Sequence, residues 1–139
     1  MAIHRAGFFR ELRHGDPSGP LLVKCRDSLE LNARAKVARY FRSGSVLATT
    51  GTMAGDWFNP SDTAVAPLEV RTDGTWAWPG DLAYYVEKYG VGVPLEMLDH
   101  MVSRGWKAPE LSGEELLTAE AEFLAPPGVP ATDPSSRRR

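Results

Sequence analysis

The stretch from Leu68 to Gly90 constrains the fold of this chain more than any other. It reads L-E-V-R-T-D-G-T-W-A-W-P-G-D-L-A-Y-Y-V-E-K-Y-G. Strand-forming residues on both sides of Asp73-Gly74 predict a hairpin with a tight turn. Beyond the hairpin, apolar residues recur at helical spacing, at Leu82, Tyr85, Val86 and Tyr89. The stretch therefore predicts two strands followed by a helix that ends at Gly90.

The tight turn also predicts which side chains share a face of the hairpin. A two-residue turn at Asp73-Gly74 places Arg71 opposite Trp76 and Glu69 opposite Trp78, and all four lie on one face. The other face carries Leu68, Val70 and Ala77. Two interpretations stay open. Either the tyrosine-rich helix covers the tryptophans, or the face is open and binds a partner, because Trp, Tyr and Arg are enriched in interface hot spots.

The remaining sequence predicts a single α+β domain over residues 1–124. We expect a small antiparallel sheet of about three strands, around the central hairpin, packed by four to five helices. The predicted strands are 46–50, 65–72 and 75–78, and the predicted helices are 8–15, 31–42, 79–90, 94–105 and one that follows a capping box at Ser112–Glu115. Residues 21–26 fit a strand or a helical turn. Residues 125–139 hold four prolines and end in three arginines, which predicts a disordered tail.

Charge is divided unevenly along the chain. Residues 1–44 carry a net charge of +5, residues 45–124 carry −9, and the tail carries +2. The two halves either complement each other within the fold or present an acidic surface that attracts a basic partner. The overall acidity argues against a nucleic-acid binder. A single cysteine, Cys25, and the absence of a long apolar run predict a cytoplasmic protein without a membrane segment.

Few residues of the sequence are candidates for catalysis or metal binding. His4, His14 and His100 have no paired spacing, so neither a metal site nor a cofactor is expected. In the predicted helix after Pro94, Glu96 lies one turn before His100, with Asp99 beside it; this cluster fits either proton transfer or a solvated helix face. In the loop at 56–62, Trp57 and Phe58 are expected to anchor the loop on the sheet. The thiol of Cys25 is expected to be buried.

The string T-D-G-x-W-x-W-P-x-x-L-x-Y-Y-V, from Thr72 to Val86, resembles a group of small uncharacterised proteins of high-GC bacteria. The resemblance covers about residues 68–106. It implies that this block is a structural signature of that group, and it implies no role for any residue.

These observations favour a non-enzymatic protein-binding module, in one version an immunity-like or antitoxin-like protein that masks a basic partner. The candidate partner-binding residues are Trp57, Arg71, Trp76, Trp78 and Tyr84. The alternative is a small enzyme or ligand-binding protein with a pocket between the hairpin and the following helices. Its candidate catalytic residues are Glu96, Asp99 and His100.

Overall fold

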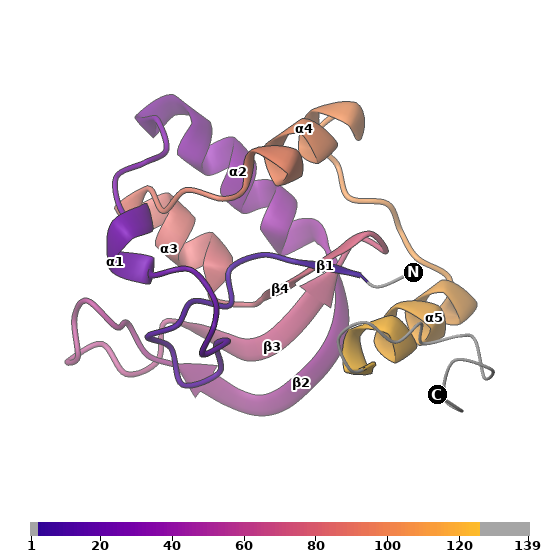
Figure 1. The fold of residues 1–139 in the computed structure, drawn as a ribbon, viewed down its shortest axis with the longest axis horizontal. Coiled ribbons are helices and arrows are strands. Elements are labelled where there is room, and N and C mark those ends of the chain that lie inside the picture. Colours follow the sequence, from indigo (N-terminus) through magenta and orange to yellow (C-terminus); the bar gives the residue numbers. More distant parts are fainter. Residues whose placement is uncertain (1–2, 126–139) are drawn as a thin grey trace.

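The computed structural model describes residues 3–125 as one four-stranded sheet with helices packed around it (Figure 1). The elements are β1 (His4–Arg5), α1 (Leu22–Cys25), α2 (Leu31–Ser43), β2 (Ser45–Ala54), β3 (Ala66–Thr72), β4 (Trp76–Pro79), α3 (Leu82–Tyr89), α4 (Leu95–Ser103) and α5 (Gly113–Leu124). The α+β prediction is confirmed. The expected tail at 125–139 lies, apart from Ala125, outside the described residues.

The sheet has the strand order β1-β4-β3-β2. Strands β2, β3 and β4 are antiparallel neighbours, as predicted, and β1 adds a short parallel strand beside β4. The sheet is therefore mixed rather than purely antiparallel. A strand of two residues carries no periodic pattern, which is why the sequence did not indicate it.

The turn between β3 and β4 is longer than predicted. Thr72 pairs with Ala77 and Arg71 with Trp78, and three residues, 73–75, lie between the ends of the two strands, so the predicted two-residue turn was wrong. The cause is the Asp73 carboxylate, whose Oδ1 accepts hydrogen bonds from the backbone N–H groups of Thr75 (2.9 Å) and Trp76 (2.8 Å). Because the pairing moves by two positions, each side chain keeps its predicted face.

The tryptophan face of the hairpin is covered by α2 and α3. Trp78 is fully buried, its ring centre lies 5.1 Å from that of Phe41, and its Nε1 donates to the Phe41 carbonyl at 3.0 Å. Trp76 is 7% exposed. Gly44, which follows α2, permits this close packing, since a Cβ there would lie 2.5 Å from the Trp78 ring. The tryptophans thus belong to the main core.

The opposite face of the sheet is covered by α5. Ala119 and Phe123 of α5 pack with Ile3, Ala77 and neighbouring aliphatic residues in a second, smaller cluster. Helix α5 begins at the predicted capping box, in which Ser112 Oγ accepts from the Glu115 N–H and the Glu115 carboxylate accepts from the Ser112 N–H.

Two predicted helices differ in the structure, one in the segment before α1 and the other at the start of α3. Residues 8–15 form turns rather than a helix. In this segment the Glu11 carboxylate accepts hydrogen bonds from the backbone N–H groups of Leu22 and Val23, at the start of α1. Pro79 ends β4 instead of opening the next helix, and α3 begins at Leu82. Gly90 ends α3 in the left-handed region (φ +62°), as predicted.

Candidate functional site

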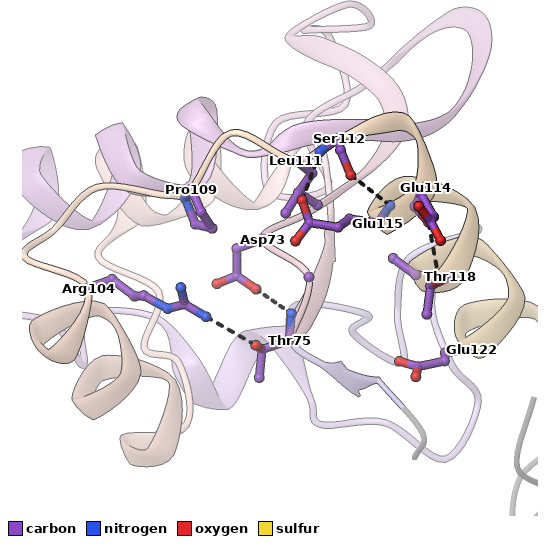
Figure 2. Close-up of a pocket in the computed structure, with 12 residues that line it drawn as sticks. Asp73, Thr75, Arg104, Pro109, Leu111, Ser112, Glu114, Glu115, Thr118 and Glu122 are labelled. Atoms are coloured by element: carbon purple, nitrogen blue, oxygen red, sulfur yellow. Dashed lines mark hydrogen bonds between the residues drawn. The ribbon is translucent and has the colours of Figure 1, made fainter. Parts of the chain in front are cut away.

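A pocket of about 470 Å³ opens where the β3–β4 turn, the segment after α4 and helix α5 meet (Figure 2). Four carboxylates line it. One belongs to Asp73 in the turn, and the others to Glu114, Glu115 and Glu122 along α5. Arg104 is the one cation among the lining residues, all of which lie within the described chain. We call this the acidic pocket.

Asp73 is buried and holds one wall of the acidic pocket in place. It is 1% exposed, and its carboxylate accepts four hydrogen bonds. Two come from the turn backbone, as described above. The other two reach Oδ2 from the Tyr40 hydroxyl of α2 (2.6 Å) and from Nε2 of His100 in α4 (2.9 Å). Burial, together with the hydrogen bond to Asp73, raises the pKa of Tyr40, which keeps this hydroxyl a donor.

The wall formed by α5 is acidic in its amino-acid sequence. Helix α5 holds four glutamates and no basic residue. Hydrogen bonds from the backbone and side chain of Ser112 lower the pKa of Glu115, so this carboxylate is ionised at neutral pH. Figure 2 shows Arg104 on the other side of the pocket, where it donates to Thr75 Oγ1 at 3.5 Å. The pocket is thus suited to a positively charged group.

The predicted partner-binding residues do not line this pocket. Trp76 and Trp78 lie in the core and are not available to a partner in this fold. Arg71 is also engaged internally, because its guanidinium donates to the carbonyls of Arg42 and Gly44 at the end of α2 and pairs with Glu69 at 2.7 Å. A cation at a helix C-terminus is a stabilising arrangement.

The other two predicted residues meet around Asp56, a second buried carboxylate. The hydroxyls of Tyr84 and Tyr89 each donate to Asp56 Oδ2 at 2.6 Å. Trp57 is 44% exposed, whereas Phe58 packs on the tyrosine rings of α3, so the loop is anchored on that helix and not on the sheet as predicted. This cluster ties the loop after β2 to α3, and Trp57 is the most exposed of the five predicted partner-binding residues.

The predicted catalytic cluster is arranged differently from its sequence pattern. His100 forms a hydrogen bond with Asp73, which is 27 positions away, while Glu96 and Asp99 occupy exposed positions on α4. His100 is not among the residues that line the acidic pocket. A second histidine–carboxylate pair lies elsewhere, where Nε2 of His14 is 2.9 Å from the buried carboxylate of Asp81, but the geometry there is not that of a hydrogen bond.

Within residues 3–125, no group of three His, Cys, Asp or Glu side chains is arranged to hold a metal ion. No helix in the same range is long and apolar enough to cross a membrane.

Comparison of the chain with protein-family models, with curated proteins and with solved structures found no match. Sequence reasoning recognised Ser112, Glu114 and Glu115 as a helix cap but did not place Arg104 or Glu122 in a site. The available signal was the acidity of residues 45–124, which indicated a charged surface without locating it.

Proposed function

We propose that this chain is a non-enzymatic protein-binding module that holds a basic segment of a partner protein in the acidic pocket. In its most specific form it is an immunity-like or antitoxin-like protein that masks the partner, in the cytoplasm. The observation that carries the proposal is the lining of the pocket, where four carboxylates face a single guanidinium. A lysine or arginine side chain of the partner complements this charge.

The hydrogen bonds of the Asp73 carboxylate favour a binding function over a catalytic one. A general base needs a lone pair that can reach substrate, and the four hydrogen bonds to Asp73 already occupy both carboxylate oxygens. The remaining carboxylates belong to α5, where one of them caps the helix. The lining of the pocket therefore supplies negative charge, but it does not supply a general acid and a general base that are placed to act together.

The outer surface of α5 favours a protein over a small cation. Leu117 is 68% exposed and Leu124 is 72% exposed, and glutamates lie between them along the helix. Apolar side chains surrounded by charged residues are the usual composition of a protein interface with an apolar core and a polar rim. A partner that covers α5 would bury both leucines while its basic segment enters the pocket.

In the first step of the test, the tagged protein captures its binding partner from a lysate of the native host. The partner is then identified by mass spectrometry. Its affinity is then measured by calorimetry for the wild type, for Glu114→Lys and for Glu96→Lys. Glu114 lines the pocket, whereas Glu96 is exposed on α4, away from the pocket and from the outer surface of α5. We expect a basic partner, about tenfold weaker binding for Glu114→Lys, and a small change for Glu96→Lys.

Affinity should also fall as salt concentration rises, since the attraction is between exposed charges. A partner without a basic binding surface, binding that is insensitive to salt, or equal losses in the two variants would each contradict the proposal.

A further inference from the structure

A second pocket, of about 460 Å³, lies between the N-terminal segment and α1. Its walls come from residues 5–9, the turn at 16–20, the end of α1 and residues 92–94. Figure 1 shows α1 beside the segment that leaves α3. Backbone hydrogen bonds join the walls, from Arg10 N–H to the Pro20 carbonyl and from Gly92 N–H to the Cys25 carbonyl, both at 2.8 Å. The pocket is therefore formed without a ligand, and its volume lies in the range of small-molecule sites, roughly 300–1,000 Å³.

The interior of this N-terminal pocket is mainly apolar. Phe8, Phe9 and Val93 contribute hydrocarbon surface, and Cys25 contributes the single thiol of the chain. Burial, with a smaller contribution from the charge of Glu11, raises the pKa of Cys25. The thiol is thus protonated at neutral pH and behaves as an apolar group. Such a lining suits an alkyl chain.

Charge at the N-terminal pocket is opposite in sign to charge at the acidic pocket. Arg5 and Lys24 line it together with one acid, Asp16, whose Oδ1 already accepts the N–H and the hydroxyl of Ser18. Arg5 is held over the Phe123 ring at 4.0 Å. Among the residues that the structure describes, none forms a hydrogen bond or ion pair with the Lys24 side chain, so its ammonium is available to an anion.

We propose that the N-terminal pocket binds a small amphipathic anion, a medium-chain carboxylate. Its alkyl chain lies against Phe8, Phe9 and Val93, and its carboxylate faces Lys24 and Arg5. The charge complementarity and the apolar interior together select this class of ligand. The proposal is independent of the partner proposed for the acidic pocket, because the two pockets share no lining residue.

The test is an NMR titration of the isotope-labelled full chain with octanoate, below the concentration at which it forms micelles. Octylammonium and octanol, which have the same chain length, are the matched probes. We expect saturable amide shifts for octanoate that are concentrated at residues 5–9, 16–20, 24–28 and 92–94. Octanol should bind more weakly at the same residues, and octylammonium should bind least, because it meets like charge.

Two variants test whether the ammonium group of Lys24 binds the carboxylate of octanoate. Lys24→Gln should weaken octanoate binding by about threefold and leave octanol unchanged, since it removes one partly exposed ion pair. Lys107→Gln, at an exposed lysine outside the pocket, is the control and should bind octanoate like the wild type. The absence of saturable shifts, shifts centred elsewhere, octylammonium binding as tightly as octanoate, or an unchanged affinity in Lys24→Gln would each overturn the proposal.

Discussion

The two faces of the sheet are covered in different ways. Against the tryptophan face, α2, α3 and α4 bury large aromatic and sulfur-containing side chains completely, Trp78, Tyr40, Phe41, Tyr85, Met97 and Met101 among them. Against the other face, α5 contributes Ala119 and a partly buried Phe123, while Leu117 and Leu124 stay exposed. One face carries the main core of the fold, and the other is covered by a helix that exposes two leucines on its outer surface.

The acidic pocket lies where these two kinds of packing meet. Asp73 is fixed by bonds to α2 and α4, whereas the glutamates lie on the lightly packed α5. Elements with few buried apolar contacts open at lower free energy than the core. We therefore expect the pocket wall at Asp73 to be rigid and the wall at α5 to be adjustable. Three experiments test the difference between the two faces.

The largest effect is expected from Trp78→Ala. This change removes a fully buried ring and leaves the Phe41 carbonyl without its indole donor. The free energy of unfolding should fall by about 3–5 kcal/mol, which for a domain of ordinary stability approaches global unfolding. Urea denaturation followed by circular dichroism measures it. Trp57→Ala, at a ring that is 44% exposed, is the control and should cost about 1 kcal/mol or less. Equal losses would contradict the assignment of the main core.

A smaller effect is expected from acidification, through Asp56 beside α3. Burial disfavours its charged form, but hydrogen bonds from Tyr84, Tyr89 and two backbone N–H groups outweigh this, and the pKa of Asp56 is lowered. A carboxylate with a lowered folded-state pKa adds stability above its unfolded pKa of about 3.9. That stability is lost as the pH falls through the folded-state value.

The unfolding free energy of the wild type should therefore decline more steeply below about pH 4 than that of Asp56→Asn, which has no carboxylate to protonate. Glu11, whose pKa is also lowered, titrates in both proteins and cancels in the comparison. Urea midpoints measured at intervals from neutral pH to about pH 3 provide the data. Parallel pH profiles would show that Asp56 does not contribute in this way.

The smallest effect is expected from Ser112→Ala, which removes the side-chain half of the α5 capping box. The loss of such a cap costs about 1 kcal/mol. Because α5 is lightly packed, we expect faster amide hydrogen exchange in α5 and unchanged exchange in α2 and α3. Ser103→Ala at the end of α4 is the control and should leave exchange in α5 unaltered. Acceleration spread over the whole chain would show that the two faces unfold as one unit.

Much of the local structure could be predicted because its causes are local. The periodicity of apolar residues located α2 to α5, Ser112 and Glu115 marked one helix start, and Gly90 marked one helix end. The two faces of the hairpin also followed from alternation alone, since a pairing change of two positions leaves alternation intact.

The remaining features depend on contacts between distant residues. The turn is widened by Asp73, whose position is also fixed by Tyr40 and His100, 33 and 27 positions away. The acidic pocket needs α5 to fold back onto that turn, which no spacing of Glu114 or Glu122 indicates. The sequence could thus predict that the candidate site is acidic, but it could not predict which elements form the walls of the pocket.

The place of β1 has a consequence for the order in which the molecule assembles. β1 pairs with β4 through His4 and Trp76, and Ile3 shares a cluster with Phe123. Strands β2, β3 and β4 can form from neighbouring segments, but these two contacts must close loops that span most of the described chain, which is entropically slower. On a ribosome, α5 emerges after the other described elements, so the wall of the acidic pocket would be completed only after the sheet and the helices on its tryptophan face have been synthesised.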